Sequence, residues 1–240
     1  MRWNYSKRPK EDGILRHPAD AEEWKQFDKR HLSFALEPKN VRFGFATDGV
    51  EPFGNMSNSY SMWHVILVSY NFFPWNCIKA ESLMLSLLIQ GCTAPEKDMD
   101  VYVRPLIEEL KELWDSGVQV RDNYNGTVFT MHAAILWTIN DFPAYAMMSG
   151  WSTNGYKACP TYNEHTFSIG LCNKIGYIGH RQFLEMENPR RRSKKYDGKI
   201  KKRPRPPEMS WDDVLAQLEQ IQYHLPRKHK QLAESNVNVL

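Results

Sequence analysis

Long apolar runs and an ordered set of cysteines are both missing from this 240-residue sequence. No apolar stretch reaches the ~18 residues that a membrane-spanning helix needs. The first residues, MRWNYSKRPKEDG, lack the apolar centre of a signal peptide. The four cysteines follow no disulfide-framework spacing, which favours reduced thiols inside a cell. We therefore expect a chain that is neither secreted nor membrane-spanning.

A large excess of one charge sign is also missing, since the formal net charge of the whole chain is only +3. Total charge alone therefore does not indicate a polyanionic partner. The basic residues are instead concentrated in one stretch near the end of the sequence: Arg190, Arg191, Arg192, Lys194, Lys195, Lys199, Lys201, Lys202, Arg203 and Arg205. Three prolines accompany them, a composition typical of a solvated segment. Three interpretations stay open: an exposed linker, a surface for phosphate backbones and a nuclear import signal.

Hydrophobic residues make up 42% of the sequence, enough for one sizeable core. Residues 41–49, 62–72 and 82–91 have strand patterns joined by short loops, which predicts an antiparallel meander. Apolar residues recur at helical spacing over 100–117, where Pro105 suits a first turn and Gly117 a stop. The apolar continuity of 127–141 predicts a buried central strand.

The order of these elements predicts an α/β (α+β) fold, a mixed sheet with flanking helices, and four segments follow from the composition. Residues 1–40 form a lead-in segment whose aromatic residues suit a short helix, and 41–150 form the core. Residues 151–188 form a loop-rich segment with Cys and His. Residues 189–240 form a basic linker and a C-terminal helix over Trp211–Leu225.

Two aspartates mark the ends of predicted strands, Asp48 in the first and Asp141 in the fourth. Neighbouring strands can bring two carboxylates from distant positions together, and hard divalent cations need such oxygen ligands. Acidic residues also end strands simply because strands end at the surface. The pattern by itself therefore leaves both interpretations open. His64 and Met84, inside strand patterns, are interpreted as core or surface positions.

The amino-acid sequence resembles that of a known family over almost all of residues 1–205. The stretches that carry the resemblance are MRWNYSKRPKEDGILRHPAD, FGFATDGVEPFGNMSNSYSMWHVILV, DMDVYVRPLIEELKELWDSGVQV, MHAAILWTINDFPAYAMMSGWST and YIGHRQFL. In order and spacing they resemble the transposase of plant CACTA (En/Spm) transposable elements. The resemblance implies a DDE/D-type enzyme with a ribonuclease H-like core that cuts and joins element ends with two Mg²⁺ or Mn²⁺ ions.

The resemblance also implies roles for individual residues. Asp48, in ATDG, matches the first catalytic acid, and Asp141, in TINDFPA, is our choice for the second. Asp100, in KDMDVY, is a rival, but it opens a helix, where aspartate often caps N–H groups. The third acid should lie on a later helix, and no matching motif follows Trp211. We therefore interpret the chain as a truncated transposase that is inactive alone, because losing one metal ligand costs orders of magnitude in rate.

The Cys/His segment departs from the family pattern of a four-ligand zinc site. The corresponding positions here are Cys159, Tyr162, Gly176 and His180, so two of the four ligands are gone. Replacement by Cys172 and His165 would require a rebuilt loop, because zinc–sulfur bonds of ~2.3 Å leave little tolerance. We predict a degenerate site that does not bind zinc.

Three functions follow as hypotheses. The first is a transposase fragment in the nucleus whose partners are DNA, full-length transposase or a second copy of itself. Its DNA-binding candidates are Arg190, Arg191, Arg192, Lys194, Lys195, Lys201, Lys202, Arg203 and Arg205. The second is a DNA- or protein-binding module without catalysis. The third is a relic without function. A complete set of carboxylates would distinguish the first from the second.

Overall fold

The computed structural model describes residues 3–6, 8, 13–53, 60–91, 94–95, 98–152, 154–159, 161–207 and 209–219. The chain divides into two compact units, the first reaching Ala144 and the second beginning at Tyr145. No helix in these ranges combines the length and the apolar composition that crossing a membrane requires. Each unit is described by itself below.

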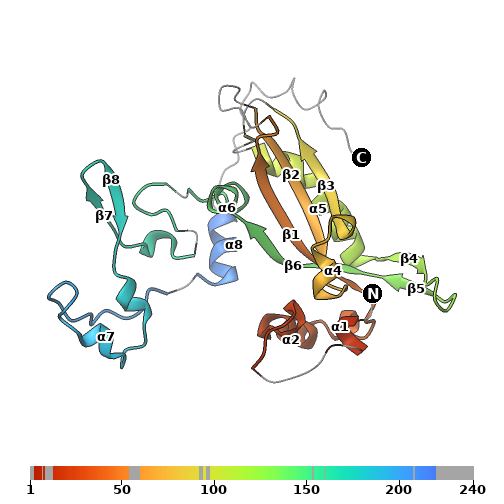
Figure 1. Ribbon diagram of the computed structural model, residues 1–240, viewed down its shortest axis with the longest axis horizontal. Helices are drawn as coiled ribbons and strands as arrows, with labels where there is room; N and C mark the ends of the chain where they lie inside the picture. The colour runs from red at the N-terminus through yellow and green to blue at the C-terminus, as the bar shows by residue number, and fades with distance from the viewer. Residues whose placement is uncertain are drawn as a thin grey trace. The chain divides into compact units, whose positions relative to one another are not determined.

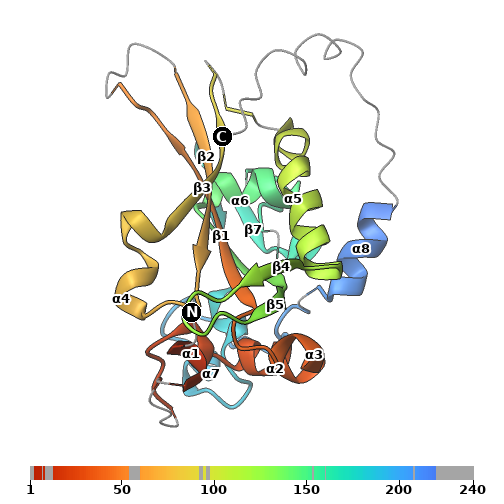
Figure 2. The ribbon, with the colours of Figure 1, turned by 90° about the vertical axis from the view of Figure 1, so that its right-hand side faces the viewer.

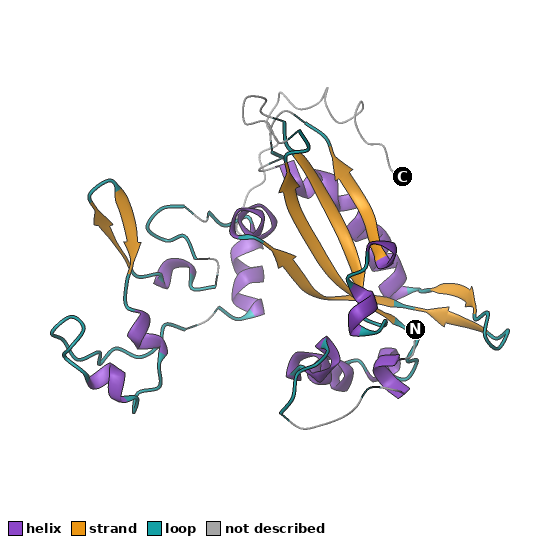
Figure 3. Ribbon diagram, in the orientation of Figure 1, coloured by secondary structure: helices purple, strands orange, loops and turns teal. Residues whose placement is uncertain are grey.

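A four-stranded sheet in the order β3-β2-β1-β6 is the centre of the first unit (Figure 1). Its strands are β1 (Val41–Val50), β2 (Met62–Ser69), β3 (Leu83–Ile89) and β6 (Ala133–Asn140). The first three pair antiparallel, whereas β1 and β6 pair parallel (Figure 3). The predicted meander and the predicted mixed sheet with flanking helices are both confirmed.

Helix α5 (Met99–Asp115) covers one face of this sheet, where it contacts β3 and β6 (Figure 2). Its buried residues Met99, Val103 and Leu110 follow the helical spacing expected from the sequence. Gly117 takes a positive φ of 67° just after the helix, as the predicted stop requires. Because the helix begins at Met99, Pro105 lies inside it rather than in its first turn.

The stretch predicted as one central strand, 127–141, is two strands, and the second lies at a sheet edge. β5 (Val128–Met131) forms a hairpin with β4 (Val118–Arg121), and His132 separates it from β6. The break occurs where the Asn40 side chain accepts a hydrogen bond from the His132 amide at 2.8 Å. β6 is apolar because α5 and Trp24 contact it, the latter through Trp137 at 6.3 Å, and not because strands flank it on both sides.

The N-terminal segment belongs to the first unit and packs on its sheet through short helices. They are α1 (Trp3–Ser6), η1 (Pro18–Asp20), α2 (Glu22–Arg30) and α3 (Leu32–Ala35), and the β2–β3 connection adds α4 (Pro74–Cys77) and η2 (Ala80–Ser82). Arg42 of β1 is 3% exposed and lies 4.9 Å from the ring centroids of both Trp24 and Phe34. Its guanidinium donates to Asp28 at 2.7 Å, which completes the contact between helices and sheet.

His17 gives the first unit a predicted dependence of stability on pH. Burial, and then the charge of Arg8, lowers the pKa of His17 from 6.5 to about 4. Between pH 6.5 and 4 the unfolded chain therefore binds a proton at His17 that the folded chain does not bind. The free energy of unfolding has its full value above pH 6.5 and decreases as the pH is lowered from 6.5 to 4. The full loss is about 3 kcal/mol.

Urea unfolding followed by tryptophan fluorescence at pH 7 and pH 4.5 measures this loss. His17→Asn is the matched control, because an asparagine side chain can still accept the hydrogen bond that the Ala19 amide donates to His17 Nδ1 at 3.1 Å. We expect the free energy of unfolding of the variant to differ much less between pH 7 and pH 4.5 than that of the intact chain. An unchanged difference would assign the pH dependence to other groups.

The second unit is built from short elements. Helix α6 (Phe142–Ser149) spans the division between the units, and η4 (Asn163–His165), the hairpin β7 (Ser168–Leu171) and β8 (Lys174–Tyr177), η5 (His180–Phe183), α7 (Pro189–Arg192) and α8 (Trp211–Glu219) follow. The predicted C-terminal helix is present up to Glu219, and its remainder lies outside the described residues.

Candidate functional site

Asp48 and Asp141 are brought to the same end of the sheet by the parallel pairing of β1 with β6. The last paired residues are Thr47 and Asn140, and each aspartate is the next residue along its chain segment. Neighbouring strands lie about 4.8 Å apart. The two aspartates therefore come directly after paired residues on adjacent parallel strands, although they are far apart in the sequence.

Each aspartate has one carboxylate oxygen engaged by the backbone. Asp48 Oδ1 accepts from the Gly49 amide at 2.7 Å, and Asp141 Oδ1 accepts from the Ala144 amide at 2.7 Å. The second bond caps the beginning of α6, so Asp141 has the capping role that the sequence suggested for Asp100. Both residues are exposed, and in the described part of the chain neither Oδ2 atom has a hydrogen-bond partner.

Asp100 lies elsewhere, in the first turn of α5, where its side chain is exposed. His64 instead is the neighbour of Asp48, because the two residues are Cα partners in the β1–β2 pairing. Partners in an antiparallel pair have Cβ atoms about 4.5–5.5 Å apart on the same face. Sequence reasoning missed this neighbour, because the strand pattern of 62–72 does not contain the register.

The basic residues of the second unit fold into a compact structure, which we call the basic lobe (residues 179–205). Arg191 lies at its centre with 1% of its surface exposed. Its Nη1 donates to the carbonyl oxygens of Gln182 and Leu184, both at 2.7 Å, and its Nε and Nη2 donate to those of Lys201 and Arg203. Buried in this way, Arg191 is not accessible to a phosphate, which corrects its place among the DNA-binding candidates.

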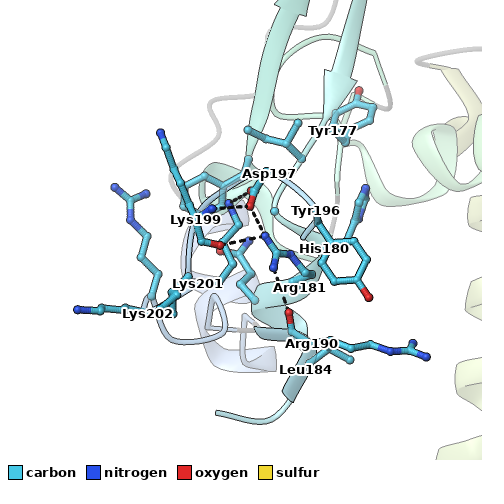
Figure 4. A pocket seen from close by; sticks show the side chains of 16 residues that line it. Tyr177, His180, Arg181, Leu184, Arg190, Tyr196, Asp197, Lys199, Lys201 and Lys202 are labelled. Atoms are coloured by element: carbon cyan, nitrogen blue, oxygen red, sulfur yellow. Dashed lines mark hydrogen bonds and ion pairs between the residues drawn. The ribbon is translucent and has the colours of Figure 1, made fainter. Parts of the chain in front are cut away.

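Arg181 makes a second set of internal contacts in the basic lobe (Figure 4). It donates to the carbonyl oxygens of Ser193 at 2.7 Å and Arg190 at 3.0 Å, and to the carboxylate of Asp197. The Lys201 ammonium lies 2.5 Å from the other oxygen of Asp197. The hydrogen bond from Lys201, followed by those from the Lys199 amide and Arg181, holds the pKa of Asp197 well below its usual range. The stretch is thus held by internal hydrogen bonds, while most of its residues are exposed, as its composition predicts.

The other basic candidates lie on the surface of the lobe. Arg192 pairs with Glu187 at 2.7 Å, and the guanidinium of Arg203 lies 5.4 Å from the Phe167 ring centroid. Arg205 donates to the Tyr162 hydroxyl at 3.2 Å. The following cations are exposed and make no ion pair within the described ranges: Arg190, Lys194, Lys195, Lys199 and Lys202. Together with Arg203, which is also exposed, these five give the lobe positive charge that no carboxylate in the described residues neutralises.

The candidate zinc ligands are distributed over several elements of the second unit. Cys159 precedes η4, which contains His165, Cys172 lies exposed in the β7–β8 turn, and His180 begins η5. Among the residues that the structure describes in either unit, no three His, Cys, Asp or Glu side chains form a group that could hold a metal ion. That this segment does not bind zinc stays a prediction.

The comparison with protein families identifies one that covers most of the chain. The family described as transposase family tnp2 matches residues 12–221, a range that includes Asp48, Asp141 and the whole basic lobe. Neither the curated proteins nor the solved structures give a match. Since the family match extends over most of the sequence, the chain belongs to the transposase family tnp2.

Proposed function

We propose that this chain is the core of a CACTA (En/Spm)-type DDE/D transposase with a ribonuclease H-like sheet, in which Asp48 and Asp141 together hold Mg²⁺ or Mn²⁺. Membership of the family connects the chain with DNA transposition, and hence with DNA as its partner. The observation that supports the cation site is the parallel register of β1 and β6, which makes these two aspartates successors of the paired residues Thr47 and Asn140.

The two carboxylates suit a hard divalent cation. Such ions take oxygen ligands, and Asp48 and Asp141 each keep Oδ2 without a hydrogen-bond partner in the described residues. The backbone amides of Gly49 and Ala144 fix the other oxygen of each group, so both carboxylates are oriented before a cation binds. A bound cation would supply charge stabilisation and an activated water for cutting a DNA strand.

We further propose that the chain does not cut DNA by itself. The described residues supply these two carboxylates and no third member of the site. Strand cleavage of this type depends on full ligation of the cations, since positioning and charge neutralisation are lost together. In the cell the chain would then act in the nucleus, on DNA, together with full-length transposase or a second copy of itself.

The second candidate function is a DNA-binding module without catalysis, and the basic lobe favours it. Its exposed cations belong to a structure held by the hydrogen bonds of Arg181 and Arg191 within the second unit. Clustered cations release condensed counterions from phosphate backbones, whatever the DNA sequence. DNA binding therefore does not depend on an intact cation site.

Titration of labelled duplex DNA at two salt concentrations, with a nicking assay in Mg²⁺ and Mn²⁺, tests both proposals. We expect sequence-independent binding that weakens steeply with salt, and no nicking. The test variant replaces four exposed lobe cations by alanine: Arg190, Lys194, Lys195 and Lys202. It should flatten the salt slope by about 0.9 for each phosphate that is no longer neutralised by a protein cation.

The matched control removes the same charge from exposed positions of the first unit: Lys29, Arg30, Lys79 and Lys111. It should bind as the intact chain does. Equal binding and an equal salt slope in the lobe variant would show that the lobe is not the DNA surface. Nicking that Asp48→Ala abolishes would show that the described site suffices for catalysis, against our second proposal.

A further inference from the structure

The basic lobe contains an open cleft of ≈ 990 Å³ whose lining is partly aromatic. The cleft lies at the end of β8, between η5 and the loop from Tyr196 to Arg203 (Figure 4). Phe167, Tyr177 and Tyr196 contribute rings to it, and basic side chains make up much of the remaining lining. Every lining residue belongs to the second unit.

Two of the three rings are open to a ligand. Tyr196 is 63% exposed and Tyr177 is 41% exposed. The guanidinium carbon of Arg181 lies 4.9 Å from the Tyr196 ring centroid, so an internal cation supports that ring. The Tyr177 hydroxyl donates to the Gly155 carbonyl oxygen at 2.9 Å, which fixes the orientation of the second ring. Ile178 and Ile200, each 43% exposed, extend this apolar surface.

The positive charge around the rings favours a polyanion as the ligand. Arg190, Lys199 and Lys202 line the cleft, and none of them makes an ion pair in the part of the chain that the structure describes. The cleft itself is held by the internal hydrogen bonds of Arg181 and Arg191 to backbone carbonyl groups. A ligand therefore meets a cleft whose backbone is already ordered by these bonds, which reduces the ordering cost of binding.

Duplex DNA would use only half of this surface. Its bases are stacked inside the helix, so it offers phosphates to the cations but no ring faces to the tyrosines. A single strand offers both, because unpaired bases stack on aromatic side chains while cations follow the backbone. An acidic peptide would satisfy the cations and leave the rings unused.

We infer that this cleft binds unpaired nucleotides of single-stranded DNA, with bases stacked on Tyr196 and Tyr177 and phosphates on the adjacent cations. The inference rests on the proposed function in that it takes DNA as the ligand. It adds a second mode of DNA binding, distinct from duplex contact through exposed charge. The tyrosines contribute only to binding of the single strand, whereas the cations contribute to binding of single-stranded and duplex DNA.

Fluorescence anisotropy with the whole chain tests the inference, using labelled oligo(dT) as the single strand and a labelled duplex of the same length. Tyr196→Ala and Tyr177→Ala are the test variants, and Tyr196→Trp keeps a stacking surface. Tyr124→Ala is the matched control, because Tyr124 is 98% exposed and lies in the β4–β5 turn of the first unit. Duplex binding in each variant also reports whether the lobe is still folded.

We expect each test variant to bind oligo(dT) about five- to hundredfold more weakly, the range for loss of one base–aromatic stack. Their duplex affinity should stay unchanged, and the tryptophan and Tyr124→Ala variants should match the intact chain. Unchanged oligo(dT) binding in both test variants, with duplex binding intact, would overturn this inference alone. Failure of the intact chain to bind either DNA would overturn the proposed DNA binding as well.

Discussion

Replacement of Arg191 by methionine is expected to unfold the basic lobe, while the same replacement of its neighbour Arg190 leaves it folded. Methionine keeps much of the apolar stem of arginine but donates no hydrogen bond. The carbonyl groups of Gln182, Leu184 and Lys201 would lose their donor, as would that of Arg203. A buried carbonyl group left without a donor costs about 1–3 kcal/mol. The bond to Gln182 is buried and the other three are partly buried, so losing all four removes a large part of the stability of a small domain, about 5–15 kcal/mol.

Hydrogen exchange of peptides from residues 179–205 measures this effect. In Arg191→Met we expect protection to fall over the stretch, because this side chain joins the carbonyl groups of Lys201 and Arg203 to those of Gln182 and Leu184. Arg190→Met should keep the protection of the intact chain, since the Arg190 side chain is exposed and makes no ion pair in the described residues. Protection that survives in Arg191→Met would show that other contacts hold the lobe.

Arg191→Lys extends the test to the geometry of the side chain. A lysine ammonium is a compact donor and cannot reach carbonyl groups on several sides, as the planar guanidinium does. We therefore expect lysine to behave like methionine, although it preserves the positive charge. Rescue by lysine would mean that charge, and not the fork of donors, stabilises the lobe.

The sequence predicts those parts of the fold that depend on local patterns. Strand alternation gives β1, β2 and β3, and helical spacing with Gly117 gives α5, because each signal lies within a single element. The place of residues 133–140 at the edge of the sheet could not be predicted from a local pattern. Apolar continuity reports contact on both faces, and here α5 and Trp24 supply it to an edge strand.

The neighbours of the candidate site depend on register, which a single sequence does not contain. Asp48 and Asp141 could be predicted as candidate site residues because each ends a strand pattern and matches a family motif. The place of His64 opposite Asp48 follows only from the β1–β2 pairing. The burial of Arg191 within a run of basic residues has no sequence signal either, since it depends on carbonyl groups from two separate stretches, 182–184 and 201–203, that meet around it.

Loss of either aspartate from this end of the sheet is expected to remove the divalent cation. Asn is the informative replacement at both positions, because its side-chain oxygen can still accept the hydrogen bond from the Gly49 or Ala144 amide. The strand end and the cap of α6 are then preserved while one negative charge is lost. Cation affinity depends on the number of charged oxygen ligands. Each replacement should weaken Mn²⁺ binding about tenfold or more, which is about 1.4 kcal/mol.

Titration with Mn²⁺ followed by electron paramagnetic resonance is the most direct test of the proposed site. The measurement compares the intact chain with Asp48→Asn and Asp141→Asn, and uses Asp100→Asn as the matched control at an exposed helical position. We predict that the intact chain and Asp100→Asn bind Mn²⁺ alike, and that both other variants lose the site. Equal binding by all four proteins, or loss of binding only in Asp100→Asn, would contradict the assignment of Asp48 and Asp141 as the cation ligands.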